Sequence, residues 1–498
     1  MERPALCGPF PFWPRTIPGF PRRHRNRMTS SSNLPPPISW HAHPDPQLEA
    51  LLARADPASL RQALDNPGVR ADSFARLRVV DALYRCDPGD EQLEWRWLQE
   101  MLLSNRPAAA WPVVQRWPQA PGTGFERLFL AAQVAQIAAP RGEAARRYQT
   151  LLQAFPDRVD AWQKALEFDP GLPVDQSGME RLDAWTSGPD AYACEKAAFA
   201  RSSLLRTAAP SESFALAMKA QALKQARIGR WNLDALVGQL AGDRAAVPVP
   251  VSGSASPGVR PVFIVGLPRS GTTLLSAMLA AHPRVSTAGE QGLVAALAMG
   301  PARSQVLSGA AHGGLYQDWY LAAVGDLTDG ADVVVDKMPL NAEHVGIILA
   351  AFPDALVVHI ERDLPDVAAS IHLHDFDFGC GFSMSAGDIG AYAGVISRHL
   401  SHWRERAPGR VLEVAYEALT QDAPKALSPV LERLGLAWDA RMADFWKRPQ
   451  SVATFSEAQV RRPLNRDAVG AWRRYLPAAE GFMRELEAQH RFRRDATG

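Results

Sequence analysis

A short apolar run followed by a glycine-containing loop constrains this chain of 498 residues more than any other feature. In the stretch FIVGLPRSGTTLLSAMLAAHP, residues 263–283, the loop separates a predicted buried strand from a predicted helix. Gly266 and Gly271 let the backbone curl so that several N–H groups can face one anion. The helix start adds its own N–H groups and the positive end of its dipole. The loop therefore predicts a phosphate or sulfate site.

The loop departs from the phosphate loop of kinases and ATPases. That loop has a lysine directly before its hydroxyl residue, whereas this chain has Thr272 there and places a cation earlier, at Arg269. Arg269 can meet a phosphate or sulfate with two parallel hydrogen bonds, and the hydroxyls of Thr272 and Thr273 can donate others. The run VVVD, which ends at Asp336, favours a kinase or ATPase instead, because a carboxylate there can hold magnesium. We interpret Asp336 instead as a loop or capping residue, since Lys337 follows it and can balance anionic charge without a metal.

Composition limits the function classes. The net charge is +1, from 54 basic and 53 acidic residues, so nothing draws the chain as a whole to nucleic acid or to an anionic membrane. No apolar run reaches the roughly 18 residues of a transmembrane helix. The cysteines are scattered without a C-x-x-C, which disfavours a disulfide framework or a zinc site and fits a cytoplasmic protein: Cys7, Cys86, Cys194 and Cys380.

The first half of the chain reads as a series of helices. Between residues 44 and 245, apolar residues recur at i, i+3, i+4 and i+7, as in 73–86, 91–103, 125–138 and 142–155. The segments look like tetratricopeptide helix pairs, which must stack to bury their apolar faces. Their period of about 34 residues is poorly kept, so a non-repetitive helical bundle is the alternative. Residues 1–42 are expected to be a disordered or wrongly assigned tail.

The second half alternates strands and helices. A linker rich in Pro, Gly and Ser, residues 246–258, separates it from the first. Strands are predicted within 260–266, 331–337, 354–362 and 409–416, and helices at 271–282, 342–351, 363–373 and 387–406. Such alternation predicts a parallel sheet covered on both faces, with ligands at the carboxyl ends of its strands. We expect residues 259–490 to form a three-layer α/β sandwich of the P-loop-like class, preceded by the all-α domain.

A second candidate anion site follows the third predicted strand. In VVHIERDLPDVAASIHLH, Arg362 lies at the end of the strand and Ser370 lies two turns into the next helix. Both side chains can therefore reach one anion. Alone this pair is a weak signal, because any exposed arginine and serine would match it. Together with the glycine loop it becomes specific.

These motifs resemble those of the sulfotransferase superfamily, whose members use 3′-phosphoadenosine 5′-phosphosulfate (PAPS). The resemblance covers roughly residues 260–475: the glycine loop looks like the family's 5′-phosphosulfate loop, and ERDLPDVAAS looks like its 3′-phosphate motif. The likeness is greatest to tetratricopeptide-repeat and tyrosylprotein sulfotransferases. Arg269 stands where cytosolic small-molecule sulfotransferases tend to carry lysine, and STAGEQ places Glu290 shortly after AHP. The segment FSEAQVRRPLNRDAVGAWRRY resembles the C-terminal segment that closes over the nucleotide.

The resemblance implies a role for each matching residue. The 5′-phosphosulfate would be held by Arg269, Ser270, Gly271, Thr272 and Thr273, and the 3′-phosphate by Arg362 and Ser370. Other parts of the nucleotide would be approached by Tyr416, Ser456 and Arg462. A sulfuryl donor has no γ-phosphate and needs no metal. The lysine with which the ATPase loop contacts the γ-phosphate would therefore not be needed.

The implied reaction moves the sulfuryl group of PAPS to an acceptor hydroxyl by in-line displacement. Glu290 is the candidate general base, and Lys337 with Arg269 would stabilise the growing negative charge. Glu290 can alternatively be a helix-start carboxylate, in which case a histidine would be the base: His282, His312, His359, His372 or His374. For His282, a helix-capping role is the simpler interpretation, and for His359 a place in the core of a strand.

The acceptor stays open among peptide tyrosine, a saccharide, a lipid and a small alcohol. A protein or peptide that docks on the helical domain is one option. Two other classes are alternatives to a sulfotransferase: a P-loop kinase or nucleotidase, and a non-catalytic repeat scaffold.

Overall fold

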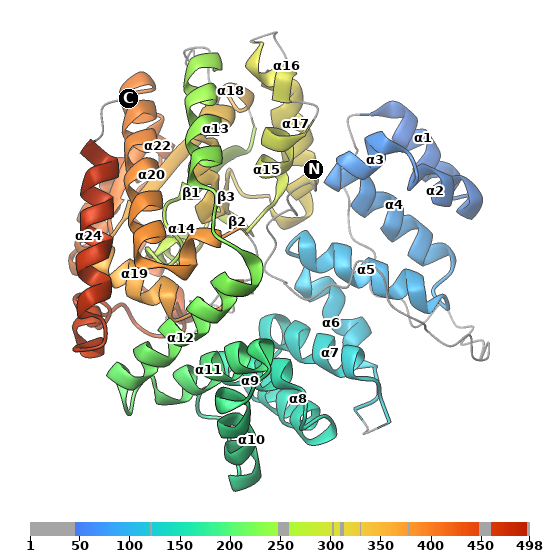
Figure 1. Ribbon diagram of the computed structural model, residues 1–498. Helices are drawn as coiled ribbons and strands as arrows, with labels where there is room; N and C mark the ends of the chain where they lie inside the picture. The colour runs from blue at the N-terminus through green and yellow to red at the C-terminus, as the bar shows by residue number, and fades with distance from the viewer. Residues whose placement is uncertain are drawn as a thin grey trace.

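The computed structural model describes residues 45–119, 122–247, 258–300, 303–308, 313–328, 330–376, 379–447 and 460–495 (Figure 1). An all-helical region comes first along the chain, and a region with a parallel sheet follows. This order and these two architectures are the ones that the sequence predicts. The predicted linker and the N-terminal tail lie almost entirely outside the described residues.

Aspartate residues set the helix starts of the first region. The Asp72 carboxylate accepts hydrogen bonds from the N–H groups of Phe74 and Ala75, and Asp90 caps the next helix in the same way. The predicted helices 73–86, 91–103 and 125–138 are confirmed with the same bounds, and 142–155 within one residue. Assignment to tetratricopeptide repeats stays a prediction. The helices are α1 (Pro46–Arg54), α2 (Pro57–Ala63), α3 (Pro67–Ala71), α4 (Ser73–Cys86), α5 (Glu91–Leu103), α6 (Pro107–Gln115), α7 (Phe125–Ala138), α8 (Arg141–Ala154), α9 (Val159–Phe168), α10 (Gln176–Ser187), α11 (Ala191–Leu205), α12 (Pro210–Ile228) and α13 (Leu233–Ala246).

The second region is built on one parallel sheet with the strand order β2-β3-β1-β4-β5. The strands are β1 (Arg260–Val265), β2 (Val285–Gly289), β3 (Val333–Lys337), β4 (Leu356–Glu361) and β5 (Val411–Ala415). The four predicted strands are confirmed, and the edge strand β2 is an addition. Because parallel strands share one direction, the loop after β1 and the segments after β2, β3 and β4 meet at the same edge.

Helices cover both faces of the sheet, which gives the predicted three layers. Val262 and Ile264 of β1 pack into one apolar cluster, and Phe263 and Val265 pack into the other. The first cluster includes side chains of α14 (Thr272–Ala280) and α22 (Ala423–Leu434), and the second those of α18 (Val345–Ala351) and α20 (Ala386–Arg406). The other helices are α15 (Leu293–Met299), α16 (Arg303–Leu307), α17 (Gly313–Val324), α19 (Leu364–His372), α21 (Tyr416–Gln421) and α24 (Glu480–Asp495), with short 3-10 helices that include η3 (Pro339–His344) and η7 (Ala471–Tyr475).

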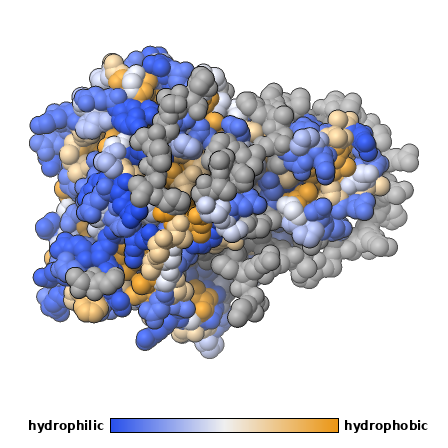
Figure 2. Space-filling model, turned by 90° about the horizontal axis from the view of Figure 1, so that it is seen from above, coloured by the Kyte–Doolittle hydropathy of each residue, from blue (hydrophilic) through white to orange (hydrophobic). Residues whose placement is uncertain are grey.

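The helical region is packed directly onto the α/β region. Phe214 of α12 and Leu236 and Leu240 of α13 are buried in the same cluster as Phe263 of the central strand. Figure 1 shows α13 lying beside α18 and α20, although it belongs to the first region along the chain. On the face seen in Figure 2, hydrophilic and hydrophobic residues are interspersed. None of the described helices is long and apolar enough to cross a membrane.

Candidate active site

The glycine loop is strained and closely packed, as expected where the backbone approaches an anion. Gly271 has a φ of +109° and precedes α14, which Thr272 and Thr273 open as buried residues. A Cβ at Gly271 would lie 2.5 Å from the ring of Tyr416, so a side chain does not fit there. Arg269 has a φ of +69°, a sparsely populated region for a residue other than glycine. The hydroxyl of Ser270 is buried and has no hydrogen-bond partner among the described residues.

The two predicted anion motifs touch each other. Nε of Arg269 donates to Oγ of Ser370 at 3.0 Å, and Arg362 donates from its guanidinium to the carbonyl of Arg269 at 3.1 Å. Burial, followed by the neighbouring guanidinium groups of Arg206 and Arg362, lowers the pKa of Arg269 to about 9. Arg269 therefore stays a cation at neutral pH, in a place where other cations oppose it. An anionic ligand would relieve this repulsion.

The C-terminal segment is fixed next to Arg362. The Arg362 guanidinium lies 4.5 Å from the ring centre of Tyr416 and donates to the carbonyl of Ala468. Asp366, 3.8 Å from Arg362, accepts hydrogen bonds from the N–H groups of Gly470 (2.6 Å) and Trp472 (2.9 Å). The part of the segment that the structure describes therefore approaches the candidate site.

Two predicted residues of that segment are not brought to the site. Arg462 is exposed, and no contact within the described ranges ties it to the loop or to Arg362. Ser456 lies outside the described residues. Tyr416, by contrast, packs against both Gly271 and Arg362.

Glu290 and Lys337 form an ion pair at the carboxyl edge of the sheet. Glu290 directly follows β2, and Lys337 ends the neighbouring strand β3. The Glu290 side chain is 19% exposed and that of Lys337 only 5%, so the carboxylate is the partner that a substrate can reach. A lysine ammonium has three donors and a carboxylate has two oxygens, so each group can hold a second partner while the pair persists.

The interpretation of Asp336 as a loop or capping residue is wrong. Asp336 lies within β3, is fully buried, and accepts a hydrogen bond from the hydroxyl of Tyr320 in α17 at 3.0 Å. Side chains alternate along a strand, so Asp336 projects from the face opposite to that of Lys337. That face belongs to the cluster around Tyr320, whereas α14 lies on the other face. The carboxylate is thus turned away from α14.

Asp336 makes a prediction for stability. Burial raises its pKa to about 8 from an ordinary value of 3.8. The folded chain therefore keeps a proton that the unfolded chain releases, and Asp336 lowers the free energy of unfolding progressively as pH rises from about 4 to 8. Compared with wild type, Asp336→Asn is expected to gain stability over this window, by at most about 1.4 kcal/mol per pH unit. Urea denaturation at pH 5 and pH 7.5 measures this gain. Equal differences between the two proteins at both pH values would contradict it.

The candidate histidine bases are placed less favourably than Glu290. His372 is buried against the rings of Phe214 and Phe482, and burial lowers its pKa to about 4. His282 follows α14, and its Nδ1 accepts the N–H of Arg284 in the turn after the helix, so its capping role stays a prediction. His359 lies in β4 as predicted. His374 contacts the backbone carbonyl of Ser370, and His312 falls outside the described residues.

Residues of the helical region reach the loop that carries Glu290. Asn105, in the turn between α5 and α6, donates to the carbonyl of Ala288 at 2.8 Å. A Cβ at Gly289, whose φ is +71°, would lie 1.7 Å from the amide nitrogen of Asn105. Gln291 donates to the carbonyl of Ser104 at 3.3 Å. Sequence analysis missed these residues, and only the glycine next to Glu290 hints that another backbone or side chain comes close.

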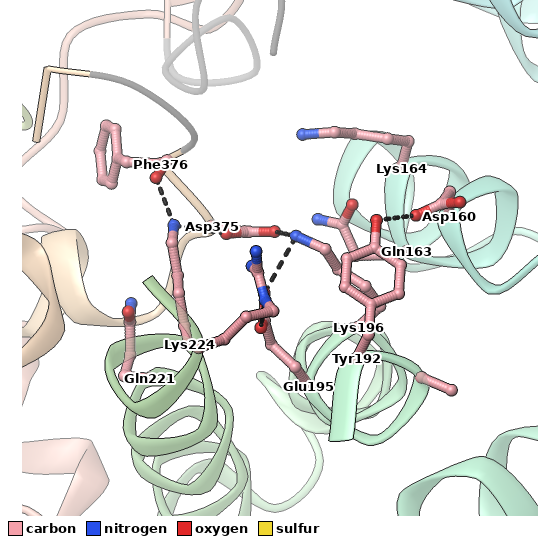
Figure 3. Close-up of polar contacts among 12 residues, drawn as sticks. Asp160, Gln163, Lys164, Tyr192, Glu195, Lys196, Gln221, Lys224, Asp375 and Phe376 are labelled. Carbon is pink, nitrogen blue, oxygen red and sulfur yellow. Dashed lines mark hydrogen bonds and ion pairs between the residues drawn. The ribbon is translucent and has the colours of Figure 1, made fainter. Parts of the chain in front are cut away.

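A buried charge cluster joins the helical region to the segment after α19 (Figure 3). Lys196 of α11 and Lys224 of α12 both pair with Asp375, and all three side chains are at most 4% exposed. Burial opposes ionisation of Asp375, but the two lysines hold its pKa below the ordinary value. Lys196 also lies 3.2 Å from Glu195, which pairs with Arg227 at 2.8 Å. We call Lys196, Lys224 and Asp375 the interdomain clamp.

A cavity of about 520 Å³ opens beside Ser270 and Arg362. Residues of α20 and α24 form one of its walls. The carboxylates of Glu361, Asp363 and Glu417 line it as well, so a second anion would be repelled there. The cavity suits an uncharged group next to an anion held by the loop. Within the described ranges, no three histidine, cysteine, aspartate or glutamate side chains are grouped as metal ligands.

A comparison with protein families shows what most of the α/β region is similar to. Residues 261–440 match the model of the sulfotransferase family. We call residues 261–440 the sulfotransferase domain, after the family whose model they match. The match includes the glycine loop, Glu290, Lys337, Arg362 and Ser370.

Relatives of the sulfotransferase domain come from bacteria and animals. An uncharacterized protein of Aquifex aeolicus (strain VF5) is 32% identical over 248 residues, which are 45% of this chain and 32% of that protein. Protein-tyrosine sulfotransferase 2 of Gallus gallus is 26% identical over 43% of this chain and 64% of its own length, and protein-tyrosine sulfotransferase of Drosophila melanogaster is 24% identical over 43% and 47%. The chain thus spans less than two thirds of each of these relatives.

Solved structures similar to the sulfotransferase domain include two from biosynthetic enzymes. The sulfotransferase domain of the Synechococcus PCC 7002 olefin synthase has 20% identity and a TM-score of 0.33, over 48% of this chain and 97% of that one. The sulfotransferase domain of the curacin biosynthetic pathway has 16% identity and a TM-score of 0.30, over 47% and 98%.

Proposed function

We propose that the chain transfers a sulfuryl group from PAPS to an acceptor hydroxyl. One observation carries the proposal: the glycine loop and the Arg362–Ser370 motif meet through Arg269 within a sulfotransferase-family domain. The unpartnered hydroxyl of Ser270 and the closely packed Gly271 fit a phosphosulfate that lies against the backbone. Arg362 and Ser370 would hold the 3′-phosphate. When bound, PAPS supplies an activated sulfuryl group on its 5′-phosphate.

Glu290 would take the proton of the acceptor hydroxyl as the oxygen attacks sulfur. In that step a bond from the acceptor oxygen to sulfur forms, the bond from sulfur to the phosphate oxygen breaks, and the electron pair of that bond leaves with the phosphate. Lys337, held beside Glu290, and Arg269 would stabilise the negative charge that grows on the departing oxygen. No step in this scheme requires a metal.

Peptide tyrosine is the acceptor that we favour. The support is the similarity to two animal protein-tyrosine sulfotransferases. Docking of such a peptide on the helical region and residence in the cytoplasm are parts of the proposal that rest on the sequence alone.

Arg362→Ala tests this function. Loss of the cation that would meet the 3′-phosphate should raise KM for PAPS by about tenfold to a hundredfold, because a charge-assisted hydrogen bond contributes about 1.5–3 kcal/mol. Sulfuryl transfer is measured in the presence of EDTA with four acceptors: a tyrosine-containing peptide, the same peptide with phenylalanine in place of tyrosine, a saccharide and a small phenol. Arg433→Ala, at an exposed arginine after β5, is the control. Turnover that needs magnesium and ATP instead of PAPS would contradict the proposal and favour a kinase.

A further inference from the structure

A guanidinium from the helical region lies beside the proposed nucleotide site. Arg206 caps the C-terminal end of α11. One terminal nitrogen lies 3.3 Å from Nε2 of His374, and the other donates to the carbonyl of Leu373 (3.2 Å) and to Oγ of Ser203 (3.4 Å). Its Nε is buried and has no hydrogen-bond partner in the part of the chain that the structure describes. Among the described residues, no carboxylate lies within ion-pair distance of Arg206.

A chain of short contacts leads from Arg206 to the 3′-phosphate motif. His374, which faces Arg206, places its Nδ1 2.6 Å from the carbonyl of Ser370. The hydroxyl of Ser370 accepts from Arg269 at 3.0 Å. The positive charges of Arg269 and Arg206 both disfavour protonation of His374. After burial, these two guanidinium groups are the largest causes that lower the pKa of His374. The imidazole is therefore neutral, and the arginines are the cations of this corner.

The carboxylate that acts on both of these arginines is already engaged. Glu167 of α9 acts on both Arg206 and Arg269 through its charge. It pairs with Lys164 at 3.4 Å and accepts from Gln163 at 3.0 Å. The C-terminal segment brings a further cation, Arg474, toward Arg206. Positive charge therefore exceeds negative charge here, and buried like charges favour the binding of an anion.

The helical region fixes the segment that Arg206 contacts. Gln221 of α12 donates to the carbonyls of His372 (3.0 Å) and His374 (3.2 Å). The interdomain clamp holds Asp375, the next residue, and Lys224 also donates to the carbonyl of Phe376 (Figure 3). Arg206 and Ser370 are thus held at a set separation before any ligand arrives, which lowers the entropic cost of binding.

We propose that Arg206 binds the 3′-phosphate of the donor nucleotide together with Arg362 and Ser370. The inference rests on the proposed function and adds to it that the helical region completes the nucleotide site. The 3′-phosphate is favoured over the 5′-phosphosulfate because the contacts of Arg206 lead to Ser370, whereas the unpartnered hydroxyl of Ser270 belongs to the glycine loop. The cavity beside Arg362 suits a phosphate less well, because carboxylates outnumber arginines in its lining.

The test compares two nucleotides that differ only in the 3′-phosphate. Adenosine 3′,5′-bisphosphate and 5′-AMP are titrated calorimetrically into the full-length wild type and the full-length variants Arg206→Gln and Arg206→Lys. Binding of 5′-AMP is also measured by competition with the bisphosphate. Arg206→Gln is expected to weaken binding of the bisphosphate by about tenfold to a hundredfold and to leave 5′-AMP within about twofold. The bisphosphate affinity of Arg206→Lys should lie between those of wild type and Arg206→Gln, because lysine keeps the positive charge but lacks the two parallel donors of a guanidinium. Arg201→Gln, five residues earlier in α11 and paired with Asp183, is the matched control.

Each outcome decides between two claims. Equal weakening of both nucleotides by Arg206→Gln would overturn the assignment to the 3′-phosphate. Unchanged binding by Arg206→Gln with weakening by Arg362→Ala would overturn the role of Arg206 and leave the proposed function standing. A wild type that does not bind the bisphosphate would overturn both. If Arg206→Gln lowers Tm, Arg206→Lys carries the comparison, and its binding at wild-type strength to both nucleotides would overturn the inference.

Discussion

Glu290→Gln is expected to lower kcat for sulfuryl transfer by about a hundredfold to ten-thousandfold while nucleotide binding stays unchanged. The amide has the shape of the carboxylate and can accept the hydrogen bond of Lys337 through its oxygen, but it cannot take a proton from the acceptor. Glu290 lies at the partly exposed side of its ion pair, at the edge where the glycine loop begins. The loss should therefore appear in kcat, with the KM for PAPS within about threefold of wild type.

Steady-state transfer to the best acceptor and calorimetric binding of adenosine 3′,5′-bisphosphate separate the two effects. Glu432→Gln, which changes an exposed carboxylate of α22, is the control. A tenfold or smaller drop in kcat for Glu290→Gln would mean that another group is the base. A drop in nucleotide affinity instead would mean that Glu290 supports the loop and does not act on the acceptor.

Asp375→Ala is expected to cost about 3–5 kcal/mol of the free energy of unfolding. Asp375 is fully buried and is the shared partner of Lys196 and Lys224, so its removal leaves two buried ammonium groups with less compensation. Lys196 would keep Glu195, and Lys224 would keep the carbonyl of Phe376. Equilibrium denaturation in urea measures the loss.

Asp183→Ala is the matched control, because Asp183 pairs with Arg201 on the surface and such pairs contribute about 1 kcal/mol or less. Similar costs for the two variants would show that the interdomain clamp is no stronger than a surface ion pair. If Asp375→Ala keeps its stability but loses nucleotide affinity, the interdomain clamp supports the nucleotide site and does not stabilise the fold.

Local patterns predict the elements that are fixed by local chemistry. The Asp72 and Asp90 caps and the spacing of apolar residues define α4 and α5 to the residue. The continuous apolar run of β1 and its glycine loop likewise predict a buried strand and a helix start. The edge strand β2 escapes prediction because VSTAG has few apolar residues, and its place depends on pairing with β3.

Contacts between distant segments are what sequence patterns do not show. The spacing of Arg362 and Ser370 is visible along one strand and helix, whereas the meeting of Asn105 with Gly289, or of Arg206 with His374, depends on how two regions pack. Asp336 was misread for a related reason. The end of VVVD, next to Lys337, resembles the start of a loop, and only the pairing of β3 and the hydroxyl of Tyr320 show that Asp336 belongs to the strand and faces the core.

Calorimetric titration of adenosine 3′,5′-bisphosphate, with and without EDTA, tests the central claim most directly. We expect micromolar binding that EDTA does not change, that ATP and 5′-AMP do not match, and that Arg362→Ala weakens by at least tenfold. Absence of binding, or binding of ATP that requires magnesium, would contradict the account of this chain as a PAPS-dependent sulfotransferase.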